Sequence, residues 1–186
     1  MELKQAVYRR RAVRQYASDP VEKETLLRLI DAAIQAPSAV NEQPWHFTVV
    51  RDRALLARIS REARAHLSRT SPAAWASPHS QDMLTDADFD IFYHAPALIL
   101  ISAKMDSPWA VADCALAAGN LMLSACAAEL GTCWIGLAQE WLGTPAGRSA
   151  LGLPTKAVPV APIIVGKPRG FLVPVQRKAP SIDWLD

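Results

Sequence analysis

The chain has 186 residues, of which 51% are hydrophobic and 20% are charged, and its formal net charge is +2. This composition supports a folded core, and the length fits one domain spanning 1–186. The near balance of charge argues against nucleic-acid binding, which needs a basic stripe. Because no apolar leader follows Met1, we expect a cytoplasmic protein.

Cysteine and histidine usage argues against disulfide bonds and against a metal site. The three cysteines form no C-x-x-C pair, so we expect reduced, buried thiols, as is typical of the cytoplasm. The four histidines are scattered without an H-E-x-x-H motif, so we expect no metal site. The long apolar stretch 107–130 contains Asp113, Asn120 and Glu129, which favours a buried helix over a membrane span.

The first half of the chain predicts two helices and a strand. A helix start is indicated at Asp19-Pro20 followed by Glu22, and Pro37 should end this helix near residue 36. Residues 46–50 predict a strand, and 53–68 predict a second helix. The Pro- and Ser-rich stretch 70–81 predicts a loop, either a plain surface connection or a cover over a site.

The second half predicts three strands, a long helix and a short one. The run 97–101 suits a central strand, and an Ala-rich helix should extend over 106–130 with Gly131 as its stop. Further strands are predicted at 132–137 and 158–165, with a short helix at 139–150 between them. No G-x-G-x-x-G, P-loop or G-x-S-x-G motif is present, which argues against dinucleotide-fold proteins, P-loop NTPases and serine hydrolases.

The tail 171–186 is apolar but has no helical period, and it contains two prolines. A tail of this kind is expected to lie on a surface, because exposed apolar patches usually mark contacts. It can cover its own domain or lie across a partner chain, and both arrangements remain open.

Basic residues cluster near both ends of the chain, as R-R-R-A-V-R near the N-terminus and G-K-P-R after the last strand. On a helical turn Arg10 and Arg14 would share one face, and in an extended segment Lys167 and Arg169 would point to the same side. Together these four side chains can hold one phosphate group. The alternative is solvated surface charge.

A third cluster of polar groups lies in the stretch A-P-S-A-V-N-E-Q-P-W, residues 36–45. Pro37 and Ser38 at a helix end can present backbone amides and a hydroxyl, and Asn41 and Gln43 bring carboxamides that both donate and accept. Such groups suit a flat heterocycle. The alternative is an ordinary turn whose side chains satisfy their own backbone.

The motifs R-R-A-V-R-Q-Y, A-P-S-A-V-N-E-Q-P-W-H-F, L-G-T-C-W-I-G and G-K-P-R occur in this order. With them the chain resembles the nitroreductase family of FMN-dependent oxidoreductases over essentially its whole length. The resemblance implies an α+β fold, a three-layer α-β-α sandwich with a mixed, mainly antiparallel sheet. It further implies an intertwined homodimer with two flavins at the interface, each touched by both chains. A C-terminal arm at 171–186 over the partner and a variable loop or lid region at 70–94 are implied as well.

The resemblance also implies the residues that bind FMN. Arg14 should lie near the pyrimidine edge of the ring, where positive charge stabilises the negative charge of the reduced ring. Ile135 and Gly136 should line the ring near N5, where a backbone amide can donate. The phosphate is expected at Arg10, Arg11, Ala12, Lys167 and Arg169. The residues expected to reach the flavin from the other subunit are Pro37, Ser38 and Asn41.

The implied activity is an NAD(P)H oxidoreductase that reduces nitroaromatics, quinones or similar flat, electron-poor acceptors by a ping-pong hydride mechanism. The alternatives are a flavoenzyme of this fold with another reaction (dehalogenase, substrate oxidase or flavin-destroying enzyme) and a non-enzymatic flavin-binding homodimer. Some family members carry an acidic residue where this chain has Ile135, so the choice between NADH and NADPH stays open.

Overall fold

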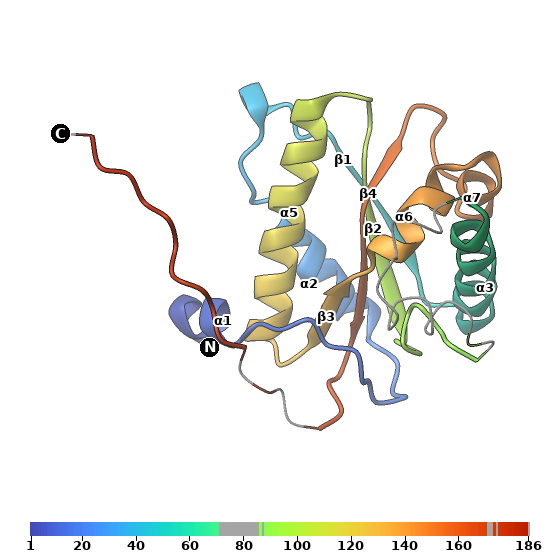
Figure 1. The fold of residues 1–186 in the computed structure, drawn as a ribbon, viewed down its shortest axis with the longest axis horizontal. Coiled ribbons are helices and arrows are strands. Elements are labelled where there is room, and N and C mark those ends of the chain that lie inside the picture. Colours follow the sequence, from blue (N-terminus) through green and yellow to red (C-terminus); the bar gives the residue numbers. More distant parts are fainter. Residues whose placement is uncertain (71–85, 87, 171–172, 174, 186) are drawn as a thin grey trace.

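A computed structural model describes residues 1–70, 86, 88–170, 173 and 175–185 (Figure 1). Its centre is a four-stranded sheet in the order β1-β2-β4-β3. All three strand pairs are antiparallel, and the one parallel pairing among the described residues is the isolated bridge between Ala12 and Thr132. The strands are β1 (Trp45–Val50), β2 (Ala97–Ala103), β3 (Gly131–Trp134) and β4 (Val158–Gly166).

Helices cover both faces of the sheet, so the predicted three-layer α+β sandwich is confirmed (Figure 1). One layer holds α2 (Lys23–Ala33) and α5 (Pro108–Ala127), with α1 (Leu3–Arg9) against α5. The other layer holds α3 (Arg53–Thr70), α6 (Gly136–Gly143) and α7 (Pro145–Ala150). A short 3-10 turn, η1 (Ala39–Asn41), precedes β1.

The position of strand β2 between two helix layers explains why its residues 97–101 are all apolar and do not alternate with polar residues. Ile99 and Ile101 belong to the core on the α2–α5 side, whereas Leu98 and Leu100 belong to the core on the α3–α6 side. Successive side chains of a strand point to opposite faces, so a strand covered on both faces needs apolar residues at every position. The predicted central strand is therefore confirmed.

Helix α5 is the one described helix long and apolar enough to cross a membrane by length and composition, yet it packs against the sheet. Ala117, Ala118 and Leu121 on its inner face are fully buried, as predicted for a core helix. Its outer face differs, because Trp109 is 72% exposed and Leu116 is 50% exposed. A large aromatic and a leucine on one uncovered helix suggest a contact surface.

Helix α2 begins later than the sequence pattern predicts. Asp19 does not cap it, since the first helical residue is Lys23 and the N-cap Glu22 makes no side-chain bond. The amide of Ala17 donates to the carbonyl of Lys167, and Val21 is buried. The chain is thus fixed against the sheet up to Val21, which overrides the local start signal.

The predicted role of Gly131 as the stop of α5 is wrong. Glu129 takes the left-handed conformation, with φ 60°, and the amide of Leu130 donates to the carbonyl of Ala125 at 2.8 Å. This is the Schellman arrangement that closes helix ends. Gly131 instead begins β3, where an added Cβ would lie 2.7 Å from the Cβ of Val13.

The predicted helix 139–150 is two helices. The hydroxyl of Thr144 accepts a hydrogen bond from the amide of Gly147 at 3.2 Å, and Pro145 opens α7. Proline lacks the amide that α6 would need to continue.

The described part of the tail leaves the body of the molecule (Figure 1). Trp184 is 81% exposed, and Ile182 and Leu185 are exposed as well. The end of the tail therefore does not cover its own domain, and the arrangement across a partner chain remains as a prediction. The predicted loop 70–81 lies outside the described residues except for Thr70, which ends α3.

Replacing Gly131 by alanine should destabilise the fold, because the new methyl group meets the buried Val13 at 2.7 Å. We expect a loss of about 1–3 kcal/mol in the free energy of unfolding, as for other overpacked sites. Urea unfolding followed by circular dichroism measures it. The control is Gly143→Ala, where nothing lies within 4 Å of the added Cβ; equal stability of the two variants would contradict the prediction.

Candidate functional site

The two basic ends of the chain lie side by side. After α1 the chain is extended rather than helical, so Arg10 and Arg14 do not share a helical face as predicted. The amide of Val13 donates to the carbonyl of Thr132 at 2.9 Å, and the amide of Arg169 donates to the carbonyl of Gln15 at 2.9 Å. Segment 10–17 is therefore fixed between β3 and the chain that follows β4.

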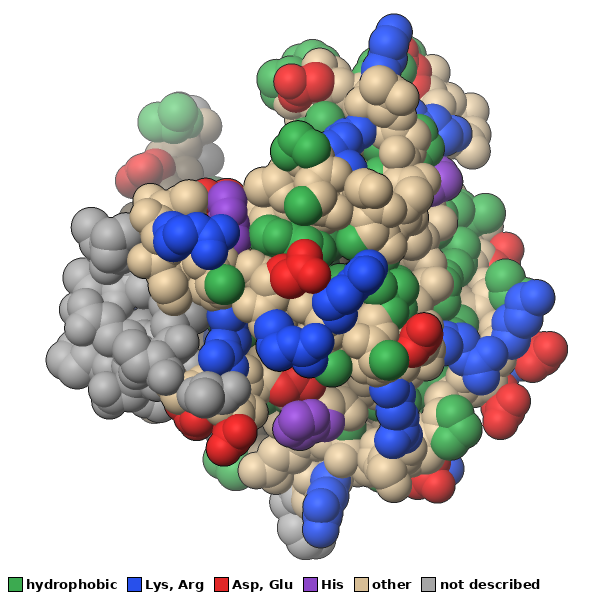
Figure 2. All heavy atoms as spheres, turned by 90° about the vertical axis from the view of Figure 1, so that its right-hand side faces the viewer, with side chains coloured by type: hydrophobic (Ala, Val, Ile, Leu, Met, Phe, Trp, Pro, Cys, Tyr) green, Lys and Arg blue, Asp and Glu red, His purple; other side chains and the backbone are tan. Residues whose placement is uncertain are grey.

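A cavity of about 520 Å³ opens along this segment, within the usual size range of ligand pockets. Five of its lining residues are arginines, and none of its described lining residues is acidic. Its lining consists of Arg10, Arg11, Ala12, Val13, Arg14, Gln15, Arg169, Val173, Val175 and Arg177. The surface beside α3 and α7 is different, because acidic and basic side chains are interspersed there (Figure 2). The pocket therefore has a concentrated positive charge that favours binding of an anion.

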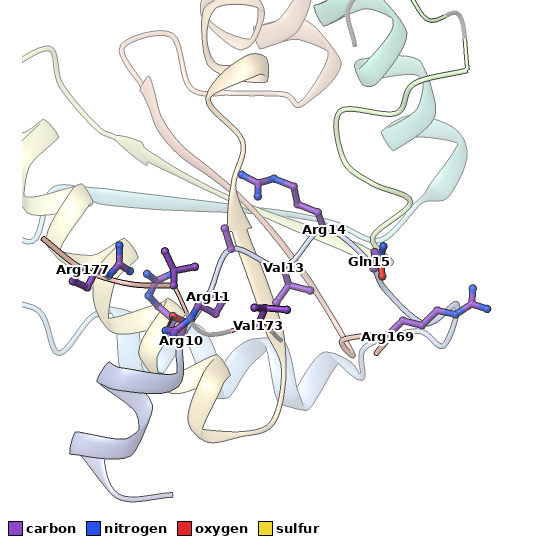
Figure 3. Close-up of a pocket in the computed structure, with 10 residues that line it drawn as sticks. Arg10, Arg11, Val13, Arg14, Gln15, Arg169, Val173 and Arg177 are labelled. Carbon is purple, nitrogen blue, oxygen red and sulfur yellow. Dashed lines mark hydrogen bonds between the residues drawn. The ribbon is translucent and has the colours of Figure 1, made fainter. Parts of the chain in front are cut away.

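The arginines border the pocket from different directions (Figure 3). Arg10, Arg11 and Arg177 gather toward one end, Arg169 lies at the other, and Arg14 projects from the segment between them. Lys167, expected at the same phosphate, is not among the lining residues. The predicted arginines therefore border one cavity without meeting at one point, and the predicted lysine does not border it.

Arg11 is the most constrained of these side chains. Its Nη1 donates to the carbonyls of Tyr8 and Arg10, both at 2.7 Å. Its Nε is buried and has no hydrogen-bond partner among the described residues. An unused buried donor carries a desolvation cost that a bound anion removes. This end of the pocket therefore fits a phosphate group.

Arg14 is held by an aromatic residue that sequence reasoning missed. Its guanidinium carbon lies 5.9 Å from the centroid of the Tyr93 ring, a cation–π distance. Burial raises the pKa of Tyr93, and the charge and hydrogen bond of Arg14 oppose that rise. Tyr93 packs edge-to-face on Phe89, and both Tyr93 and His94 have left-handed backbones. No motif marks this part of the sequence.

Two neutral groups, Tyr16 and Cys133, lie beside the arginine segment 10–17 that lines the pocket. The Tyr16 hydroxyl donates to the carbonyl of Val13 at 2.7 Å, and burial raises the pKa of Tyr16 far above its usual range. Burial also raises the pKa of the Cys133 thiol, and the charges of Arg14 and Arg10 oppose that rise. Tyr16 thus keeps the proton with which it binds the backbone of Val13, the residue before Arg14.

Ile135 and Gly136 lie where β3 passes into α6. The amide of Ile135 donates to the carbonyl of Pro162 at 2.8 Å, so it is already used. Gly136 is the first residue of α6, where helix amides have no partner within the helix. The donor expected near the ring is therefore the amide of Gly136 rather than that of Ile135.

The remaining predicted residues, Pro37, Ser38 and Asn41, lie far from the arginines of the same chain. Their turn contacts α5 at Asp113, whereas Val13 lies against Gly131 beyond the other end of α5 (Figure 1). The helix between Asp113 and Ala127 is about 20 Å long at the usual rise per residue. One chain does not bring the two groups together.

Comparison with known proteins agrees with this architecture. Residues 7–167 match the family described as the nitroreductase family. An NADH dehydrogenase of Thermus thermophilus is 30% identical over 185 aligned residues, which cover 90% of this chain and 87% of that protein. A 4-nitrobenzoate reductase of a Nocardioides strain is 28% identical over 191 aligned residues, covering 84% of this chain and 76% of that protein.

A solved structure shows the same fold. The nitroreductase of Bacteroides fragilis, crystallised with bound FMN, superposes with a TM-score of 0.87 over the full length of both chains at 24% identity. The family match covers most of the sequence, and the solved structure has the same layers. This chain is therefore a member of the nitroreductase family.

Proposed function

We propose that this protein is an FMN-dependent NAD(P)H oxidoreductase that reduces flat, electron-poor acceptors such as nitroaromatics and quinones. The observation that carries the proposal is the cavity with five arginines and no described acidic residue, formed by segments from both ends of the chain. All three cysteines are free, which fits a reducing compartment such as the cytoplasm.

The phosphate of FMN fits the arginine pocket. A phosphate dianion accepts bidentate bonds from guanidinium groups, and the unused Nε of Arg11 adds one buried donor. Arg169 is exposed, and exposed side chains change rotamer rapidly, so this arginine can turn toward the anion. The chain's contribution here is binding and orientation.

The ring is proposed to lie between two copies of the chain. A two-fold axis that sets two α5 helices antiparallel would place the turn of one chain, with Pro37, Ser38 and Asn41, beside the arginines of the other. The exposed Trp109 and Leu116 supply apolar surface for such a contact. The arm begins at the pocket itself, because Val173, Val175 and Arg177 line it, and it is proposed to continue over the second copy.

When bound, FMN supplies hydride transfer at its N5 atom, from NADH or NADPH and then to the acceptor. Arg14, held over Tyr93, would place a fixed positive charge at the ring edge, and the amide of Gly136 would donate near N5. These fixed groups favour the charge that develops on the ring, so no acid or base of the chain is required for the first transfer.

The visible spectrum tests the proposal. The purified protein should be yellow or become yellow with added FMN, and NADH or NADPH should bleach it under nitrogen. Adding a nitroaromatic or a quinone should restore the colour. A colourless protein that takes up no FMN would contradict the proposal, and a yellow protein that nitroaromatics reoxidise only slowly would favour another reaction on this fold.

Removing pocket arginines should weaken FMN binding. The single variant Arg169→Ala should lose affinity, and the double variant Arg10→Ala with Arg169→Ala should lose about 2 kcal/mol or more, roughly 30-fold. Quenching of flavin fluorescence measures the dissociation constant, and gel filtration should show an unchanged dimer. The matched control Arg61→Ala removes an exposed charge from α3, outside the pocket. If all variants retain FMN equally, the arginines are ordinary surface charges.

A further inference from the structure

Asp113 is a buried carboxylate in an otherwise uncharged helix. It is 5% exposed, and it is the only charged side chain in α5, a helix described at every position. Both of its oxygens lie 3.2 Å from the backbone nitrogen of Ala39. Within the described part of the chain it has no ion-pair partner.

The turn that Asp113 holds has an unfavourable backbone. Val40, Asn41 and Gln43 all have left-handed conformations, with φ values of 44°, 59° and 50°. Such a conformation is especially unfavourable for a β-branched residue, and Val40 is 90% exposed, so burial of its side chain does not compensate. The turn needs other contacts to persist.

The contacts within the turn are local. The amides of Asn41 and Glu42 donate to the carbonyls of Ser38 and Ala39, both at 3.0 Å. The amide of Gln43 donates to the hydroxyl of Ser38 at 3.1 Å, and the side-chain amide of Gln43 donates to Asn41 at 3.1 Å. Both bonds are exposed and move with the turn itself. The bond from Ala39 to Asp113 differs, because it joins the turn to a helix of the core.

A residue that only filled space at position 113 would be apolar. Its neighbours on the inner face of α5 are alanine, cysteine and leucine, and burying a carboxylate without a cation is costly. A charged acceptor makes a stronger bond to a backbone amide than a neutral acceptor does. The carboxylate is therefore best explained by the bond to Ala39.

We propose that Asp113 is a positioning residue that holds the turn around Ser38 and Asn41 in its flavin-binding conformation. This inference rests on the proposed function, because that turn is one wall of the proposed FMN site. Without the bond, the turn would relax toward ordinary backbone conformations, and FMN would bind only after the turn is ordered again. The affinity for FMN should then fall, because Asp113 acts on the site through the turn.

The test compares three variants. Asp113→Ala removes the acceptor, and Asp113→Asn keeps one neutral acceptor oxygen. The control Asn120→Ala also lies on α5 and removes a bond to the carbonyl of Ala32, at the end of α2. Hydrogen exchange is measured on flavin-free protein over residues 38–43, and FMN binding is measured by fluorescence quenching.

We expect Asp113→Ala to speed exchange over residues 38–43 and to weaken FMN binding about tenfold, as expected for the loss of a hydrogen bond to a charged group. Asp113→Asn should lie between this variant and the wild type, and Asn120→Ala should change neither quantity. Thermal unfolding of each variant reports any general loss of stability.

Two outcomes would overturn the inference. If Asp113→Ala lowers the melting temperature but leaves exchange over residues 38–43 and FMN affinity unchanged, Asp113 only stabilises the fold. If Asn120→Ala weakens FMN binding as much, the effect belongs to the helix and not to the turn. If the wild type takes up no FMN, the proposed function fails, and the exchange measurement alone decides whether Asp113 holds the turn.

Discussion

The length of α5 is the constraint on which the account depends. The helix carries the turn with Pro37, Ser38 and Asn41 near one end, and the arginine segment lies beyond its other end, against Gly131. About 20 Å of rigid helix therefore separates these two walls of the proposed site, the turn wall and the arginine wall. No rearrangement of side chains closes such a distance. The proposed second, antiparallel copy would close it, and it would also cover the apolar outer face of α5. The end of the tail, where Ile182, Trp184 and Leu185 are exposed, would belong to the same proposed arrangement.

Both proposed walls are costly without a ligand. The arginine wall gathers like charges and leaves the Nε of Arg11 without a partner in the described structure. The turn wall holds three non-glycine residues in left-handed conformations, each of which costs about 1–3 kcal/mol. Sites where local rules are broken are usually those that serve function, because the rest of the fold stabilises them. A bound anion and ring would compensate for these costs.

The sequence predicts the fold where a signal is long and local. The period of α3 and the apolar run of β2 are of this kind. Prediction from the sequence fails where a tertiary contact overrides a local pattern. Buried Val21 moves the start of α2, and Gly131 serves to admit Val13 rather than to end α5. The pairing of the arginine segment with β3 could not be predicted from the sequence either, because it joins residues far apart in the chain.

The candidate site could also be predicted from the sequence only in part. Its four motifs identify the residues and the family, and the family resemblance assigns Pro37, Ser38 and Asn41 to the other subunit; the structure adds how far this turn lies from the arginines of the same chain. Tyr93 lies in a stretch without a motif, and Asp113 looked in the sequence like a polar interruption of an apolar helix. Their importance depends on single contacts, to Arg14 and to Ala39, which have no sequence pattern.

The central claim is that each flavin lies between the arginine wall of one chain and the turn of another. Co-expression of two differently tagged chains tests it, one carrying Arg10→Ala with Arg169→Ala and the other Ser38→Trp, which obstructs the turn. Both homodimers should bind FMN more weakly than the wild type, whereas the purified heterodimer should bind about one FMN per pair of chains with wild-type affinity, because one of its two sites is intact. A heterodimer without flavin, or a monomer that binds FMN, would contradict the account.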